Sequence, residues 1–432
     1  MPDEKRIQHT RAVRPRETTA PQSAVRSGRK KRPDSLEVRR EDLSMVKKVD
    51  SDENIVRVRT GVDRVMLALI LILLALGSIM VFSASYPSAL AQEGDSLYYI
   101  KRQLIFIAIG VAAMIVISIF PPVFYKKMTF IFFCACLFLL VIVLIPGIGI
   151  SNGEARRWLG LKGTPFTFQP SELMKAALVM MLAWYLDVFH EAVNDRMNRR
   201  RRFFWGTLIP CGFVGVACVL VLLEKHLSGT VILGCIGLAV MFIAGVHPGW
   251  MMGIVGTGGA LAGGAFLLLN PYAWERITTF FDKNADKLDE KWQTTQGLYA
   301  IGSGGVLGVG LGGSRQKYSY VSEAQNDFIF TIWCEEMGFV GAVVLIILYV
   351  LFIWRGYVIA MRAPDTYSAL TVFGITSQVG IQALLNIGVV TDVLPNTGIS
   401  LPFFSYGGTS LIILLAEMGI LLSISKHSYQ HR

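Results

Sequence analysis

The sequence predicts an all-α polytopic membrane protein with about ten transmembrane helices and a large fourth extracellular loop. Of its 432 residues, 53% are hydrophobic and only 17% are charged, and the mean hydropathy is +0.50. This composition is more apolar than that of an ordinary soluble domain. The apolar residues fall in blocks of about 20, the length of a helix that crosses a bilayer core.

The cysteines and histidines give no sign of a metal centre. All six cysteines lie inside apolar segments, which predicts small buried hydrophobes rather than disulfides or zinc ligands. The six histidines form no H-E-x-x-H pattern. We therefore expect no metal site built by the protein alone.

Residues 1–60 differ from the rest of the chain. They contain 16 Lys and Arg against 10 Asp and Glu and few large apolar residues, so we expect a disordered basic cytoplasmic tail. Attraction to anionic lipid or to a partner protein explains this charge as well as nucleic acid does, and we expect no nucleic-acid partner. The tail is too long and polar to begin a signal peptide, so the first apolar block should remain in the mature protein.

The predicted membrane domain, residues 61–426, contains ten apolar spans. They cover roughly 63–85, 102–119, 128–147, 171–189, 204–223, 229–246, 249–269, 328–353, 367–390 and 405–425. One of them contains Gly259 and Gly263, a small-residue pattern that predicts close helix packing.

Basic residues predict the orientation of the spans. With ten spans, the short connections 120–127, 190–203 and 354–366 lie on the same side as the tail and carry nine Lys and Arg. The positive-inside rule makes that side, and both termini, cytoplasmic.

The opposite side then carries five external loops. They are 86–101, 148–170, 224–228, 270–327 and 391–404. The fourth is by far the longest, and its aromatic and glycine residues predict an ordered structure rather than a linker.

Several charged residues lie in or next to these external loops. Glu172 and Lys175 are three residues apart on one predicted helix face and can pair, a structural role that competes evenly with a functional one. Arg156 and Arg157 lie outside, where the positive-inside rule gives no reason for them, and guanidinium groups at headgroup depth suit phosphate binding.

The end of the fourth loop contains the most informative carboxylate. Seven glycines in 302–313 occur without a βαβ unit, so we expect them to let backbone approach a substrate or another segment rather than to bind a dinucleotide. Asp327 then opens an apolar span, where local sequence favours a helix cap over a catalytic base. Glu335 and Glu336, deeper in that span, need polar or cationic partners.

The last external loop is rich in helix-breaking residues. Segment 394–410 contains two prolines and three glycines, which predicts a re-entrant or broken helix buried in protein or lining a cavity.

Five motifs, in order over roughly 62–425, together resemble the SEDS family (shape, elongation, division and sporulation), whose members include FtsW, RodA and SpoVE. The motifs are Asn152-Gly153…Arg156-Arg157-Trp158, Gln169-Pro170-Ser171-Glu172…Lys175, Gln293…Gln296, Glu323…Asp327-Phe328-Ile329-Phe330…Glu335-Glu336-Met337-Gly338-Phe339 and Leu394-Pro395…Gly398…Leu401-Pro402-Phe403…Ser405-Tyr406-Gly407-Gly408. Met80–Ser85 is more similar to the division or sporulation members than to RodA, and we expect a division protein of the FtsW type.

The resemblance implies a ten-helix peptidoglycan glycosyltransferase that polymerises lipid II at the outer face of the bacterial cytoplasmic membrane. It places the essential acid at Asp327, which overrides the local preference for a cap. The expected substrate-binding residues are Arg156, Arg157, Arg276, Lys317, Gln293, Gln296, Glu172, Lys175 and Ser405.

The resemblance also implies partners and a place in the cell. The expected partners are a class B penicillin-binding transpeptidase and divisome proteins, and the expected location is the division septum. A divalent cation, Mg²⁺ or Mn²⁺, is an optional cofactor without a dedicated cage in the sequence.

One motif departs from the family, and two other functions stay open. Many members have Pro-Asp-Leu-Gly-Thr after the fifth span, where this chain has Glu224-Lys225-His226-Leu227-Ser228-Gly229-Thr230, so a role of that aspartate does not transfer. A lipid II flippase would use polar residues through the whole membrane depth, and a division scaffold would use the tail to bind cytoplasmic partners.

Overall fold

The computed structural model describes most of the chain from residue 46 onward. The described residues are 46–49, 56–59, 61–152, 155–160, 167–195, 197–281, 291–318, 320–321 and 323–430. Most of the predicted tail lies outside them. Its described residues form two short strands, β1 (Val46–Val49) and β2 (Val56–Arg59), and β2 pairs with β6 (Tyr429–Gln430).

Helices occupy all ten predicted spans. They are α2 (Arg64–Glu93), α3 (Tyr98–Ile119), α4 (Pro122–Leu144), α5 (Pro170–Val188), α7 to α8 (Arg199–Leu223), α9 (Leu227–Ile243), α10 (Pro248–Leu269), α13 (Ile329–Met361), α14 (Thr366–Val390) and α15 (Gly408–His427). Eight of these are long and apolar enough to cross a membrane. The other two are α9, with 17 residues, and α5, which has 19 residues and contains three charged ones. The prediction of an all-α polytopic membrane protein is confirmed.

Hydrogen bonds show that the predicted external loops meet at one end of the helices. Ser228 Oγ donates to the carbonyl of Thr397 at 2.8 Å, and Thr409 Oγ1 donates to the carbonyl of Thr167 at 3.1 Å. Arg157 donates to the carbonyl of Lys225. Loops far apart in sequence are therefore neighbours at this end, which we call the outer end.

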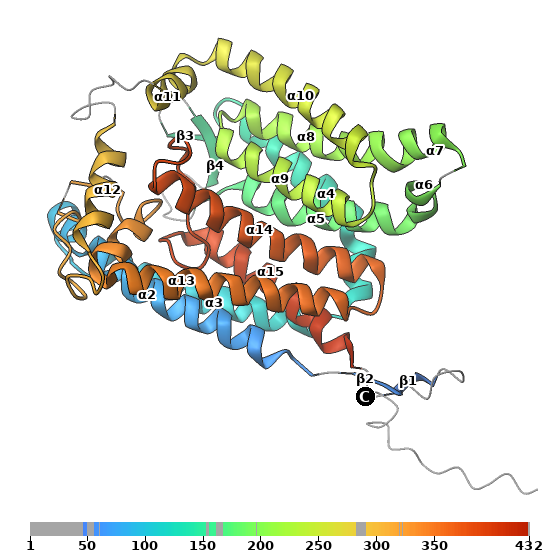
Figure 1. Cartoon of the computed structure of the whole chain (residues 1–432), viewed down its shortest axis with the longest axis horizontal. Helices are drawn as coiled ribbons and strands as arrows, with labels where there is room; N and C mark the ends of the chain where they lie inside the picture. The colour runs from blue at the N-terminus through green and yellow to red at the C-terminus, as the bar shows by residue number, and fades with distance from the viewer. Residues whose placement is uncertain are drawn as a thin grey trace, which may run out of the picture. The chain divides into compact units, whose positions relative to one another are not determined.

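The predicted cytoplasmic connections meet at the opposite end. Lys126, at the start of α4, pairs with Asp187, near the end of α5, at 2.5 Å. Lys426 Nζ donates to the carbonyl of Ser118 at 2.9 Å. Figure 1 shows α12 and β4 at one end of the bundle, and α7, β2 and the chain's C-terminus towards the other.

The external loops contain regular structure of their own. The second loop forms a small antiparallel sheet of β3 (Ile150–Asn152), β4 (Ala155–Gly160) and β5 (Thr167–Phe168). The fourth loop contains α11 (Pro271–Phe281) and α12 (Trp292–Ser303). The order predicted for the fourth loop is confirmed in these parts, while 282–290 lies outside the described residues.

The broken transmembrane helix is α13, not the segment after α14. Gly338 inside α13 has φ 66° and ψ −165°, a conformation that interrupts the helix. Residues 391–407 form no helix, and they lead directly into α15. The prediction of a re-entrant or broken helix at 394–410 is therefore wrong, because residues 394–407 form no helix and the break lies in α13.

The glycine-rich loop repairs the break in α13. The N–H groups of Val309 and Gly310 donate to the carbonyls of Glu335 and Glu336, both at 3.0 Å. In return, the N–H groups of Phe339 and Val340 donate to carbonyls of the same loop at 2.9 and 3.1 Å. These bonds replace those that a continuous helix would form within itself. The loop therefore approaches another segment of the chain, one of the two options that its glycines predict.

The two adjacent carboxylates of α13 anchor the same loop. Glu336 accepts from Ser83 Oγ at 2.7 Å and pairs with Lys317 at 3.0 Å. Glu335 accepts from Ser314 Oγ at 2.5 Å and from the N–H of Arg315 at 2.9 Å. The partners that two buried carboxylates require come from the loop and from α2.

The packing predicted from the small residues of α10 is not present within the described part of the chain. A Cβ atom built on Gly259 or Gly263 meets no atom within 4 Å. Only two residues of α10, Met251 and Phe266, are buried. The small-residue pattern therefore does not mark a helix contact inside this bundle.

We expect Gly308→Ala to destabilise the protein more than Gly310→Ala does. Both glycines have positive φ, +80° and +92°, which costs a non-glycine residue about 1–2 kcal/mol. A Cβ on Gly308 would also lie 2.2 Å from the carbonyl oxygen of Glu336, whereas one on Gly310 meets nothing within 4 Å. Thermal unfolding of the two purified variants measures the difference, and equal shifts in Tm would show that the loop does not need this close contact.

Candidate functional site

Asp327 lies at the outer end of α13, and its side chain is not the helix cap. The residue is half-buried, and the N-cap of α13 is the next residue, Phe328. Oδ2 of Asp327 lies 3.1 Å from the position of a Cβ built on Gly398, which has φ +66°. The carboxylate therefore faces the irregular segment between α14 and α15, where a glycine leaves room for it.

Three hydrogen bonds fix the backbone around Asp327. Asn386 Nδ2, on α14, donates to the carbonyl of Asp327 at 2.7 Å and to that of Ile399 at 2.5 Å. Ser405 Oγ donates to the carbonyl of Asn326 at 2.6 Å. Asn386 is 1% exposed, so these bonds form away from water and hold the acid in one place.

Helix α12 supports the same region from the fourth loop. Asn396 Nδ2 donates to Gln293 Oε1 at 3.2 Å, which joins α12 to the segment that faces Asp327. Gln296 is buried. Gly297 packs against the Phe328 ring, since a Cβ there would lie 3.1 Å from it. The two glutamines of the predicted site thus lie on a helix that contacts both sides of the acid.

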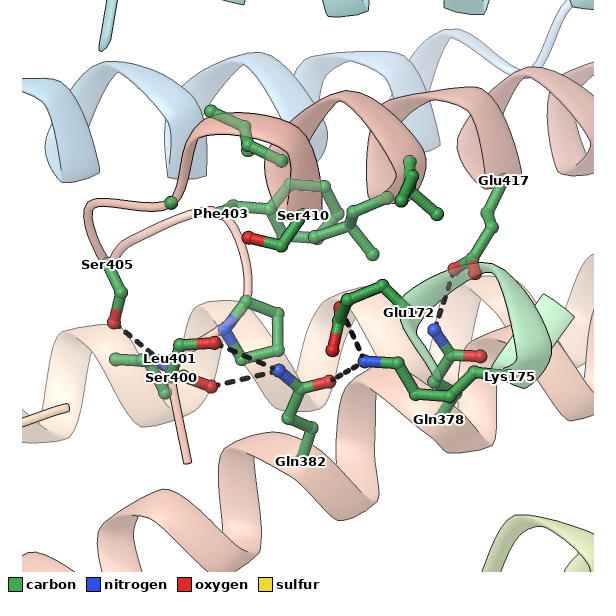
Figure 2. Close-up of a pocket in the computed structure, with 15 residues that line it drawn as sticks. Glu172, Lys175, Gln378, Gln382, Ser400, Leu401, Phe403, Ser405, Ser410 and Glu417 are labelled. Atoms are coloured by element: carbon green, nitrogen blue, oxygen red, sulfur yellow. Dashed lines mark hydrogen bonds and ion pairs between the residues drawn. The ribbon is translucent and has the colours of Figure 1, made fainter. Parts of the chain in front are cut away.

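A polar pocket extends from the outer end of α5 into the bundle. Lys175 pairs with Glu172 at 2.8 Å and donates to Gln382 Oε1 at 3.1 Å. Gln378 donates to Glu417 at 2.8 Å. Figure 2 shows these five side chains converging from α5, α14 and α15. The pairing predicted for Glu172 and Lys175 is confirmed, and the pocket places two carboxylates beside one ammonium group.

The pocket and the surroundings of Asp327 share one backbone segment. Gln382 Nε2 donates to the carbonyl of Ser400 at 3.0 Å. Ser405, which lines the pocket, accepts from the N–H of Leu401 at 2.8 Å and also binds the backbone before Asp327. A ligand in the pocket would therefore act on the same segment that faces the acid.

The two arginines of β4 have different surroundings. Successive side chains of a strand point to opposite faces, and Arg156 is exposed while Arg157 is half-buried. Arg157 donates to the carbonyl of Lys225, whose φ is +57°. Arg157 thus holds the short loop after α8, and Arg156 is the more accessible of the two to a substrate.

The loop after α8 is where the chain departs from the family motif. His226 accepts from Gln169 Nε2 at 3.1 Å, and burial, together with Arg157 and Lys175, lowers the pKa of His226 to about 3. His226 is therefore neutral at physiological pH and supplies no positive charge to a substrate.

Glu224, in the same loop, is a buried carboxylate. It is 1% exposed, and neither carboxylate oxygen has a hydrogen-bond partner among the described residues. Burial raises its pKa to about 8, although the nearby Arg157 opposes this shift. Glu224 therefore keeps its proton at neutral pH.

Two predicted substrate contacts, Lys317 and Arg276, are not found facing a substrate site among the described side chains. Lys317 is 5% exposed and is committed to Glu336, Ser83 and the carbonyl of Gly312, so its ammonium group stabilises the loop rather than facing a substrate. Arg276 lies in α11, but its side chain is not among those described.

Sequence reasoning assigned no role to several residues of the site. Asn386, Gln378 and Gln382 are amides inside the apolar α14, and Glu417 is a carboxylate inside α15. A polar side chain within a transmembrane helix is itself a signal of function or of a buried partner. Among the described residues, no three His, Cys, Asp or Glu side chains form a group able to hold a metal ion.

Comparison with known proteins identifies the family. Residues 63–430 match the family described as "Cell cycle protein", that of FtsW, RodA and SpoVE. The chain belongs to this family. Stage V sporulation protein E of Bacillus subtilis (strain 168) is 39% identical over 374 residues, which cover 86% of this chain and 98% of the relative. A probable peptidoglycan glycosyltransferase FtsW of Geobacter sp. (strain M18) is 36% identical over 366 residues, covering 84% and 97%.

Solved structures of the family share the fold. A chain from a structure titled "Structural coordination of polymerization and crosslinking by a peptidoglycan synthase complex" aligns with a TM-score of 0.67 at 26% identity, covering 85% of this chain and 99% of that one. The rod shape determining protein RodA of Thermus thermophilus aligns with a TM-score of 0.62, also at 26% identity, covering 85% and 98%. The SEDS resemblance drawn from the motifs is confirmed.

We expect the stability of Glu224→Gln, relative to that of the wild type, to increase as the pH rises from about 5 to 8. The folded-state pKa of about 8 lies above the ordinary value of 4.5, so the folded state binds more protons than the unfolded state between these values. Stability contributed by Glu224 therefore falls with pH across this window, by at most roughly 1.4 kcal/mol per pH unit. The variant lacks this loss.

The measurement is Tm against pH for the wild type, Glu224→Gln and the exposed-site control Glu191→Gln. The control should follow the wild type. If the Tm of Glu224→Gln changed with pH in the same way as that of the wild type, Glu224 would not be a buried, protonated carboxyl group.

Proposed function

We propose that this chain is a peptidoglycan glycosyltransferase that polymerises lipid II into glycan strands at the outer face of the bacterial cytoplasmic membrane. The observation that carries the proposal is the setting of Asp327, a half-buried carboxylate at the outer end of the bundle that faces Gly398. Membership of the family and its relatives named peptidoglycan glycosyltransferase support the same chemistry.

Asp327 acts as the general base in this proposal. It takes the proton from the C4 hydroxyl of the acceptor sugar, and that oxygen attacks the anomeric carbon of the donor. The bond from this carbon to the diphosphate oxygen breaks, the diphosphate-lipid leaves, and the configuration inverts. A well-placed base contributes about 10²–10⁴-fold to the rate. A diphosphate leaving group needs little protonation, so one carboxylate suffices.

The rest of the rate enhancement comes from positioning and from positive charge on the departing diphosphate. Arg156 is the leading candidate because it is exposed at the outer end. Arg157 is the next, half-buried on the opposite face of β4, and Arg276 follows. The proposed sugar- and lipid-binding residues remain Gln293, Gln296, Glu172, Lys175 and Ser405.

A divalent cation would fit this site only if the protein and the substrate bound it together. Mg²⁺ in phosphate chemistry commonly takes one or two carboxylates together with substrate phosphate oxygens. Asp327 would be the carboxylate that holds the ion, and Mg²⁺ or Mn²⁺ would supply charge at the diphosphate. Activity after treatment with EDTA and re-addition of each ion tests this part of the proposal.

We infer a role in septal synthesis with both termini in the cytoplasm. Relatives named FtsW and the segment Met80–Ser85 support the division role, and the basic connections support the orientation. A class B penicillin-binding transpeptidase and divisome proteins are the proposed partners, since a structural relative belongs to a peptidoglycan synthase complex. Imaging of the tagged protein in dividing cells tests its location.

We expect the purified Asp327→Asn protein to fold and to polymerise lipid II about 10²–10⁴-fold more slowly than the wild type. The amide is nearly the same size, but it cannot accept the proton. The measurement is a gel assay on labelled lipid II, with and without the transpeptidase partner, next to the wild type. If Asp327→Asn made strands of wild-type length at the wild-type rate, Asp327 would not be the base. Movement of lipid II across vesicles by the wild type, without strand formation, would instead support a flippase.

We also expect Gly398→Ala to lower polymerisation at least tenfold. The new Cβ would lie 3.1 Å from Oδ2 of Asp327 at a position with φ +66°, so it moves the carboxylate that we assign as the base. The same assay measures the loss. Gly147→Ala is the control because Gly147 has φ +96° and no atom within 4 Å of its added Cβ. If both variants lost the same activity, backbone strain alone would explain the loss.

A further inference from the structure

The end of the bundle opposite Asp327 contains a basic cavity that the glycosyltransferase reaction does not use. The cavity has a volume of about 490 Å³ and lies among the starting residues of α2 and the final turns of α13 and α15. Its lining includes Arg64, Arg355 and Arg362 and the carboxylate of Asp63. Three arginines and one aspartate therefore line the cavity, which has an excess of positive charge.

The single carboxylate already joins α2 to α13, and the backbone N–H of the same residue binds α15. Asp63 is the N-cap of α2, and its Oδ1 accepts from the N–H of Met66 at 2.9 Å. Arg355 of α13 binds the same carboxylate through Nε at 3.0 Å and Nη2 at 2.6 Å. The N–H of Asp63 donates to Ser425 Oγ of α15 at 3.2 Å. The walls of the cavity are thus fixed by these bonds.

The other two arginines are available to a ligand. Arg64 and Arg362 are exposed, and neither forms an ion pair in the part of the chain that the structure describes. They come from different helices, α2 and the end of α13, and line the same cavity. Guanidinium groups bind phosphate oxygens through two parallel hydrogen bonds.

The remaining walls combine four apolar side chains with Gly61, Ser425 and Ser428. Val62, Val65, Val358 and Ile359 line the cavity beside the arginines. The cavity borders the ends of three membrane-spanning helices, and the predicted topology places this end in the cytoplasmic leaflet. A site that joins positive charge to apolar wall at this depth suits a phosphodiester with attached glycerol carbons better than a small soluble anion.

We propose that this cavity binds the headgroup of an anionic phospholipid of the inner leaflet, with Arg64 and Arg362 contacting the phosphate. The lipid would lie between α2, α13 and α15. The proposal is independent of Asp327 and of the polymerisation reaction.

The test is native mass spectrometry of the purified full-length chain, titrated with phosphatidylglycerol or, for comparison, phosphatidylethanolamine. Two surface charges near anionic lipid correspond to roughly a 10- to 30-fold change in affinity. We therefore expect Arg64→Gln with Arg362→Gln to weaken the tightest phosphatidylglycerol binding by that factor. The double variant keeps Asp63 and Arg355, and an unchanged Tm confirms that it is folded.

Two matched variants make the result specific. Arg199→Gln with Arg200→Gln removes two arginines from the same predicted side, where they lie over Trp250 and Phe204, and should leave lipid binding unchanged. Arg64→Lys with Arg362→Lys keeps the charge and should retain part of the affinity.

The proposal would be overturned if the Arg64/Arg362 double glutamine variant bound phosphatidylglycerol as tightly as the wild type does. It would also be overturned if the Arg199/Arg200 control lost as much affinity, or if the wild type bound phosphatidylethanolamine as tightly as phosphatidylglycerol. Displacement of the lipid by millimolar inorganic phosphate would assign the cavity to a free anion rather than to a lipid headgroup.

Discussion

Hydrogen bonding of irregular backbone within an apolar bundle is the constraint on which the outer half of this protein depends. Polar backbone groups that leave helical geometry inside a membrane protein must find partners within the protein. At Gly338 the partners come from the glycine-rich loop, and around Asp327 they come from Asn386 and Ser405. Each repair brings distant parts of the sequence together, so satisfying the backbone also builds the site.

The same constraint fixes the position of Asp327. Its backbone is held by α14, its neighbour Phe328 packs against α12, and its carboxylate faces a glycine of the final external loop. The pocket of Glu172 and Lys175 contacts the other side of that final loop through Gln382. A ligand in the pocket would therefore be connected to Asp327 through this loop.

The sequence predicted the bundle well because span length and charge placement are local properties. It also predicted the Glu172–Lys175 pair, since three residues on a helix fix that distance. It mistook Lys317 for a substrate contact because a cation in an external loop gives no sign of the buried Glu336 that binds it. Asn386 received no role, since its partners are carbonyls of segments that only the fold brings near. The role of Gly398 depends on its contact with Asp327, and a single sequence does not show that the two residues are neighbours in space.

The central claim is that one carboxylate, Asp327, removes the proton from the acceptor sugar. The most direct test is the pH dependence of glycan polymerisation by the purified wild-type protein and of the residual rate of Asp327→Asn, both at saturating lipid II. A base must be ionised to act, so we expect the wild-type rate to fall at acidic pH as a single group gains a proton. The residual rate of the variant should lack this fall. The same acidic fall in both proteins would contradict the account, because the titrating group would then be a different one.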